Sequence, residues 1–221
     1  MGPPPFGPTP SGPAPFGPPP FGPPPGEWAD ALRTRLFDHR TILVRGTLDD
    51  GVANQAAAEL MTLDATGDSR ITMHLDLSGG TLEAAFALMD VIDLVGVPVH
   101  ALCVGRAEGA AVGVLAVATR RAGARHATFR LRDPTADVAG PASELARWAE
   151  HHRGQVQRFH ERLAAAVHRP VARVATDCEA GAFLTAEQAL AYGLIDEVAT
   201  ARGAVYPLPG RRVGFRPDDQ P

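Results

Sequence analysis

Apolar and polar positions along the middle of the chain switch repeatedly between the repeat of a strand and the repeat of a helix. From residue 71 to residue 77 every second side chain is apolar, which predicts a β-strand. Apolar residues then recur at intervals of three or four, at Leu82, Phe86, Met89 and Ile92, which predicts a helix with one buried side. Strands that alternate with helices in this way indicate an α/β fold.

The same patterns extend over most of the chain. Strands are predicted at 41–45, 71–77, 98–104, 125–131 and 194–198, and helices at 28–39, 52–63, 82–92, 109–118, 141–168 and 185–193. Asp49 or Asp50 can cap the second helix, and Gly193 can end the last one. Thr185 and Gln188 have the spacing of a capping box. The run at 109–118 is small and apolar on all sides, which is typical of a fully buried helix.

The helix at 141–168 is the longest predicted element. Its apolar stripe is narrow, and its opposite side is rich in arginine, glutamate and histidine. Such a helix either packs on its own domain or extends to meet a partner helix. The stripe consists of Leu145, Trp148, His152, Val156, Phe159, Leu163 and Ala166.

Both ends of the chain differ from the middle. Residues 1–26 form an arm in which glycine recurs at every fifth position and proline fills most of the others. Because proline fixes φ and lacks an N–H donor, we expect this arm to be disordered. It acts either as a solubilising tail or as a ligand for a proline-recognising groove. Residues 201–221 are expected to form a loose tail, which leaves 27–200 as the predicted domain.

Composition restricts the possible functions. The chain has 221 residues, of which 45% are hydrophobic and 21% charged, and this suits a globular domain with a sizeable core. Its formal net charge of −4 argues against a general nucleic-acid partner. We find neither an apolar run long enough for a membrane span nor a secretory signal, so a cytoplasmic protein without a membrane partner is expected. All 21 basic residues are arginine, which excludes a catalytic lysine.

No cofactor and no metal site are expected. The chain has two cysteines, Cys103 and Cys178, too few for a disulfide framework. A packing role is expected for Cys103, and a surface or packing role for Cys178. His151 and His152 lack a carboxylate partner on the same helical face, and His160 is placed on the polar side of the long helix. The arginine-rich segment at 120–132 is interpreted as solvated strand and loop edges.

Several short strings carry a resemblance to a known family. They are Asp76-Leu77-Ser78-Gly79-Gly80, Cys103-Val104-Gly105-Arg106-Ala107, Phe183-Leu184-Thr185-Ala186 and Tyr192-Gly193-Leu194-Ile195-Asp196. In this order and spacing, over roughly residues 34–199, the chain resembles the Clp protease proteolytic subunit family of the ClpP/crotonase superfamily. The resemblance implies a spiral of ββα units with a protruding handle helix. It also implies Ser–His–Asp peptide hydrolysis inside stacked heptameric rings.

When the family's triad positions are transferred to this chain one by one, none of them holds a serine, histidine or aspartate. The nucleophile position, at the start of the buried helix, is Gly109. The histidine position is Arg132, and the aspartate position is Gly181. The backbone N–H groups of the oxyanion hole correspond to Gly79 and Ala110.

These replacements predict the loss of hydrolysis. Glycine has no side chain that could attack a carbonyl, and arginine stays protonated and cannot serve as a general base. Ser78 is the one serine beside the expected pocket, but no base is placed for it. Glu108 either pairs with Arg132 and plugs the former site, or both side chains face an interior chamber or solvent.

Three functions remain open at this stage. The first is a proteolytically inactive paralogue that serves as a structural, regulatory or peptide-binding component of a ring, either of this chain alone or mixed with an active paralogue. Docking of an unfoldase is in doubt because the Pro/Gly arm replaces the N-terminal gate of the family. The alternative is an active ATP-dependent Clp-type serine endopeptidase subunit with an unrecognised catalytic arrangement. A third reading is crotonase-like acyl-CoA chemistry, which shares the paired N–H groups.

Overall fold

The computed structural model describes residue 2, residues 25–134 and residues 138–199, with side chains described from residue 32 onward in the longer ranges. The states predicted for the N-terminal arm and the C-terminal tail therefore fall almost entirely outside the described residues. The first helix, α1 (Pro25–Asp38), begins two residues inside the predicted arm.

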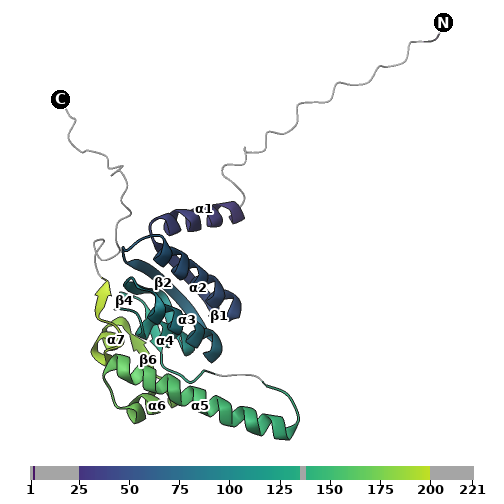
Figure 1. Cartoon of the computed structure of the whole chain (residues 1–221), viewed down its shortest axis with the longest axis vertical. Coiled ribbons are helices and arrows are strands. Elements are labelled where there is room, and N and C mark those ends of the chain that lie inside the picture. Colours follow the sequence, from purple (N-terminus) through teal and green to yellow (C-terminus); the bar gives the residue numbers. More distant parts are fainter. Residues whose placement is uncertain (1, 3–24, 135–137, 200–221) are drawn as a thin grey trace.

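A mostly parallel sheet forms the centre of the fold (Figure 1). Its strands are β1 (Thr41–Leu48), β2 (Ile71–Gly80), β3 (Val99–Glu108), β4 (Arg120–Ala124), β5 (Thr128–Arg130), β6 (Phe183–Thr185) and β7 (Glu197–Ala199). The order along the main path is β1-β2-β3-β4-β7, while β5 pairs with β3 and, antiparallel, with β6. The described residues thus confirm the predicted α/β fold.

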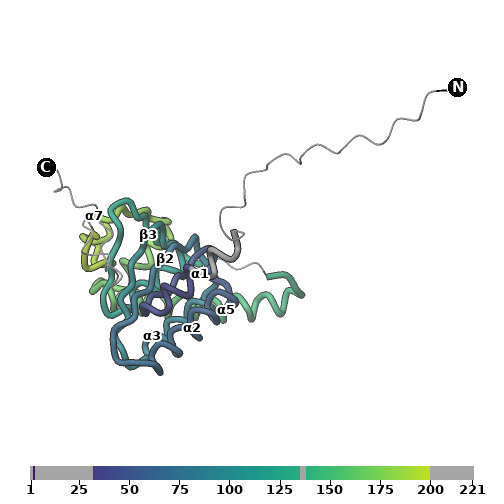
Figure 2. Tube along the Cα trace, turned by 90° about the horizontal axis from the view of Figure 1, so that it is seen from above, coloured from purple at the N-terminus to yellow at the C-terminus, as the bar shows by residue number. Residues whose placement is uncertain are grey.

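Helices connect and cover these strands. Besides α1 they are α2 (Asp50–Ala65), α3 (Leu82–Leu94), α4 (Ala110–Ala116), α5 (Ala142–Val167), α6 (Val171–Glu179) and α7 (Ala186–Tyr192). Helices α2 and α3 lie side by side (Figures 1 and 2). The predicted caps are confirmed: Asp49 caps α2, Thr185 and Gln188 form the capping box of α7, and Gly193 ends α7 with φ 89°.

The strand predicted at 125–131 is confirmed only in part, because β5 covers residues 128–130 while Arg125 and His126 form a turn. Strand β4, which precedes this turn, was not predicted. Strand β4 pairs with the first half of β3, and β5 pairs with its last three residues. Strand β3 also continues through Gly105, where the prediction ended it. A Cβ built on Gly105 would lie 2.3 Å from Oδ1 of Asp76, so the absence of a side chain allows the two strands to approach here.

Helix α6 and strand β6 were not predicted. Only two residues of α6 are buried, Val174 and Cys178, so its apolar pattern is too short to be recognised. Strand β6 has three residues and no buried side chain. The turn between α5 and α6 is made by His168, which adopts the left-handed conformation, and by Pro170, which precedes the first residue of α6.

Helix α4 lies in the middle of the core, as predicted, and all seven of its residues are buried. It contacts α5 closely at Gly113, where a Cβ would lie 2.6 Å from Cε2 of Phe159. Phe159 is 1% exposed. The α4–α5 contact therefore depends on a small residue on one helix and a large aromatic residue on the other.

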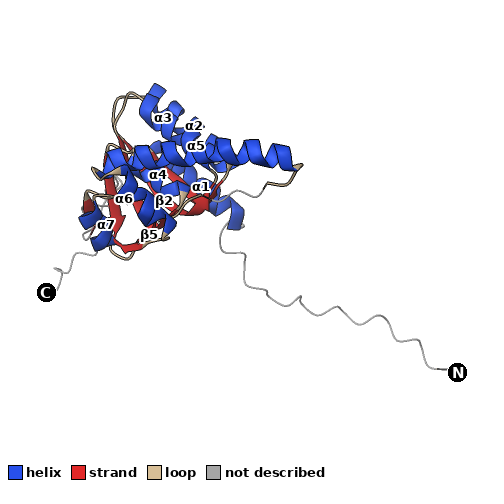
Figure 3. Cartoon of the chain, turned by 90° about the horizontal axis from the view of Figure 1, so that it is seen from below, coloured by secondary structure: helices blue, strands red, loops and turns tan. Residues whose placement is uncertain are grey.

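Helix α5 extends away from the body at its N-terminal half (Figures 1 and 3). Its buried residues all lie in the C-terminal half: Gln155, Phe159, His160, Leu163, Ala164 and Val167. The predicted protruding handle is therefore confirmed. Among the described helices none is both long and apolar enough to cross a membrane.

Candidate functional site

The fold brings together the three positions that the resemblance assigned to a catalytic triad. The backbone N–H of Gly109 donates to the carbonyl of Arg130 over 3.0 Å. The N–H of Leu131 donates to the carbonyl of Ala182 over 2.9 Å, which places the neighbouring Gly181 beside the same segment. Gly109, Arg132 and Gly181 are thus assembled around the end of β5, although they come from three separate parts of the sequence.

Gly109 forms the sharp turn between β3 and α4. Its backbone has φ 54° and ψ −125°, a conformation that glycine adopts without strain and a side chain disfavours. A strained strand-to-helix turn is also the geometry that exposes a nucleophile in many hydrolases. The turn is therefore present at this position, while the hydroxyl that such a turn would expose is absent.

Arg132 lies across this turn. A Cβ built on Gly109 would be 3.5 Å from both Cγ and Nε of Arg132. A Cβ built on Gly79 would be 3.0 Å from Nη2 of the same side chain. The side chain of Arg132 therefore reaches from the former nucleophile position to one of the two former oxyanion-hole positions. Its Nε is buried and has no hydrogen-bond partner among the described residues.

Of the two arrangements left open for Glu108 and Arg132, whose side chains are both described, the ion pair between them is not formed among the described residues. The physical reason is the direction of Arg132, whose side chain crosses Gly109 toward Gly79. Of these two residues, Arg132 is therefore the one whose side chain lies over Gly109.

A second arginine lies at the aspartate position. A Cβ built on Gly181 would be 3.6 Å from Nη2 of Arg130. The Arg130 guanidinium stacks on the ring of Phe183 with 4.5 Å between its Cζ and the ring centroid. Its buried Nε has no hydrogen-bond partner within the described parts of the chain. Two arginines thus lie where a neutral imidazole and a carboxylate would be needed.

The serines of the described residues do not replace the missing nucleophile. The hydroxyl of Ser78 donates to the carbonyl of Gly46 over 3.2 Å, so it bonds to the backbone and not to a base. Ser69 and Ser143 are exposed and lie in a turn and in the first turn of α5. Ser11 lies outside the described residues.

The structure reveals one cluster of reactive residue types that the sequence did not suggest. Asp133, His160 and Cys178 have ligand atoms that all lie within 4.8 Å of one another. Nε2 of His160 is 2.7 Å from Oδ1 of Asp133. The placement of His160 on the polar side of α5 was wrong, because it is 5% exposed and faces the body.

This cluster has the residue types of a cysteine protease, but it lacks the required access and ionisation. Cys178 is 2% exposed, so a substrate carbonyl cannot reach its sulfur. Burial, followed by the charges of Asp133 and Asp177, raises the pKa of the Cys178 thiol to about 12. Since the thiolate is the nucleophilic form, Cys178 is not an attacking group at neutral pH.

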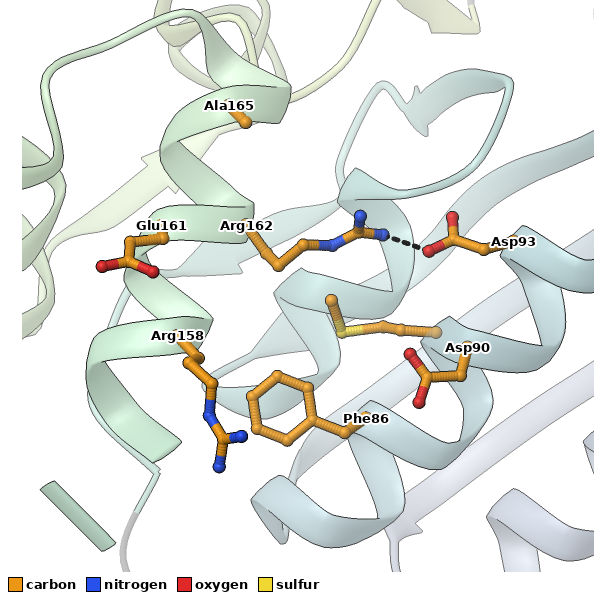
Figure 4. Close-up of a pocket in the computed structure, with 8 residues that line it drawn as sticks. Phe86, Asp90, Asp93, Arg158, Glu161, Arg162 and Ala165 are labelled. Atoms are coloured by element: carbon orange, nitrogen blue, oxygen red, sulfur yellow. Dashed lines mark hydrogen bonds and ion pairs between the residues drawn. The ribbon is translucent and has the colours of Figure 1, made fainter. Parts of the chain in front are cut away.

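The described surface also has a cavity of about 640 Å³ between α3 and α5 (Figure 4). Phe86 and Met89 supply apolar surface, and charged residues of both signs surround it. In Figure 4 the guanidinium of Arg162 points toward Asp93, with which it forms an ion pair. None of the three triad positions lines this cavity, so it is separate from the site at Gly109.

Two arginines of the arginine-rich segment form ion pairs with carboxylates at the edge of the sheet. Arg120 pairs with Glu197 over 2.7 Å, and Arg121 donates to Asp196 through both its backbone and its side chain. Burial raises the pKa of Asp196, but the hydrogen bonds from Arg121 outweigh this and hold it below its usual value. His126 is exposed in the turn between β4 and β5. The interpretation of solvated strand and loop edges therefore holds for the exposed residues Arg120, Arg125 and His126. It is wrong for Arg121, whose side chain is 14% exposed, and for Arg130 and Arg132, whose Nε atoms are buried.

Comparisons with known proteins agree with this geometry. The Clp protease family model matches residues 25–202. The chain is 31% identical over 183 residues to the ATP-dependent Clp protease proteolytic subunit 3 of Rhodococcus jostii (strain RHA1), an alignment that covers 81% of this chain and 91% of that relative. The chain therefore belongs to the Clp protease family.

Proposed function

We propose that this chain is a Clp proteolytic-subunit relative that does not cleave peptide bonds and that acts as a structural or peptide-binding component of a ring. The observation that carries the proposal is the side chain of Arg132, which extends over Gly109 and reaches Gly79. A guanidinium thus takes up the space that a hydroxyl, an imidazole and a substrate carbonyl would share in an active subunit.

The chemistry of the three positions supports this proposal. Gly109 and Gly181 have no functional group, and Arg132 cannot accept a proton because its guanidinium stays charged at any workable pH. In a well-studied serine protease, removal of the nucleophile or the base lowers turnover by about 10⁶-fold. Oxyanion-hole donors alone retain a rate of about 10³-fold over water.

The side chain of Arg132 also obstructs the remaining oxyanion hole. Donors stabilise a developing oxyanion when they point into a space that the substrate oxygen can enter. Here Nη2 of Arg132 lies beside Gly79 and takes part of that space. The alternative, an active serine endopeptidase with another arrangement, gains no support from Ser69, Ser78 or Ser143.

Helix α5 supplies the surface for ring assembly in this proposal. Its N-terminal half projects from the body and has no buried residue before Gln155 (Figure 3). Leu145, Trp148 and Val156 lie half-buried along one side of it. An apolar stripe on a projecting helix suits contact with a second helix of the same kind. We propose that this stripe joins two rings, either of this chain alone or mixed with an active paralogue.

Native mass measurement after co-expression with an intact-triad Clp proteolytic subunit tests the assembly. We expect a ring-sized particle that contains both chains. Trp148→Ala should yield particles of half that mass, because it removes the largest apolar side chain of the stripe. The control Glu150→Ala alters an exposed residue on the same helix and should leave the mass unchanged. A chain that remains a monomer both alone and in the presence of the relative would contradict the proposal.

A further inference from the structure

A small group of metal-binding side chains lies beside the former active site and takes no part in the proposed function. Asp133 follows β5, His160 is on α5 and Cys178 is on α6. His160 and Cys178 face each other across the α5–α6 contact, and Asp133 closes the cluster from a third segment. Carboxylate, imidazole and thiolate are all ligands that zinc accepts.

We infer that Asp133, His160 and Cys178 form a binding site for a divalent transition-metal ion, with zinc as the ion that suits these donors best. The three donor atoms lie within 4.8 Å of one another. Zinc bonds of about 2.0–2.3 Å in tetrahedral geometry place ligand atoms about 3.3–3.7 Å apart. The ion would therefore replace the 2.7 Å hydrogen bond between Asp133 and His160, and these atoms would separate by less than about 1 Å.

The surroundings of the cluster suit an ion. His160 is 5% and Cys178 2% exposed, and helices α5 and α6 fix both side chains. The side chain of Asp133 is 36% exposed, so an ion can enter the cluster from this side and a water molecule can serve as a further ligand. The neighbouring carboxylate of Asp177 is engaged by Tyr192 at 2.9 Å and by Arg173 at 3.2 Å, and it is left out of the ligand set.

Such an ion would connect the base of the handle to the former active site. Asp133 directly follows Arg132, so a bond from Asp133 to the ion would hold the segment from which Arg132 extends over Gly109. It would also join α5 to α6 at the point where the handle leaves the body. Metal binding at this site would therefore be structural and would stabilise the arrangement that fills the former site.

Titration of the full-length, metal-free protein with Co²⁺ and then Zn²⁺ tests the inference. We expect one equivalent of Co²⁺ to give a thiolate-to-cobalt charge-transfer band and the visible bands of a four-coordinate ion, and Zn²⁺ to displace it. Cys178→Ser should abolish the charge-transfer band. Asp133→Asn, a change at a partly exposed position, should weaken Zn²⁺ binding by about 10-fold or more while the circular dichroism spectrum is retained.

Cys103 provides a matched control. It is also buried, with 0% exposure, but it lies in β3 outside the cluster. Cys103→Ser should keep the cobalt spectrum of the unaltered protein. The inference is overturned if the full chain gives no charge-transfer band, or if the band survives in Cys178→Ser. Unchanged Zn²⁺ affinity in a folded Asp133→Asn protein would likewise remove Asp133 from the site.

Discussion

The triple variant Gly109→Ser/Arg132→His/Gly181→Asp should gain peptidase activity, which we expect to be absent from the unaltered chain. It places a hydroxyl, an imidazole and a carboxylate at three positions that the fold already assembles around the end of β5. The backbone at Gly109 has φ 54° and ψ −125°, so a serine there would stand on a sharp turn at the start of α4. We expect hydrolysis of a small peptide substrate at least about 10³-fold faster than by the matched double variant described next.

The double variant Arg132→His/Gly181→Asp is the control for this prediction. It replaces the guanidinium of Arg132 by an imidazole and adds a carboxylate at Gly181. Because it still has no nucleophile at Gly109, it should not hydrolyse the peptide. The serine in the triple variant should cost about 1–3 kcal/mol of stability because of its positive φ. Arg130 lies beside the new carboxylate, and Arg130→Gln in addition should raise the rate by removing this competitor. Equal activity of the double and triple variants would show that Gly109 is not the nucleophile position.

The second large effect concerns stability. Phe159→Ala should lower the free energy of unfolding by about 3–5 kcal/mol, because it empties the space between α4 and α5. Phe159 is 1% exposed and packs against Gly113, which has no side chain to fill the resulting cavity. Urea denaturation followed by circular dichroism measures the loss.

Phe183→Ala is the matched control for that measurement. Phe183 is also aromatic, but it is 65% exposed and its described ring contact is with the Arg130 guanidinium. Its replacement should change the free energy of unfolding by no more than about 1 kcal/mol. Similar losses for the two phenylalanines would mean that α5 does not depend on the contact with α4.

The parts of the fold with strong local patterns could be predicted from the sequence. The alternation at 71–77 and the uniformly small, apolar run at 109–118 are confirmed as β2 and α4. The family was also predicted correctly from short strings. The separation of β4 from β5 could not be predicted, because it follows from the way both strands share β3, a contact distant in sequence.

The candidate site was predicted only in part. Its positions could be assigned from the resemblance, but the direction of Arg132 depends on packing around Gly79 and Gly109. The sequence therefore left open whether Arg132 would pair with Glu108. The cluster of Asp133, His160 and Cys178 gave no signal, since the three residues come from separate segments and α6 itself was not predicted.

Labelling of the unaltered protein with a serine-directed fluorophosphonate, read by intact mass, tests the central claim most directly. Hydrolysis by a serine protease requires an activated hydroxyl, and such a hydroxyl reacts with this probe. We expect the mass of the unaltered chain to stay the same, while the triple variant in the same experiment gains one adduct. Stoichiometric addition to the unaltered chain, located on any of its serines, would contradict the account.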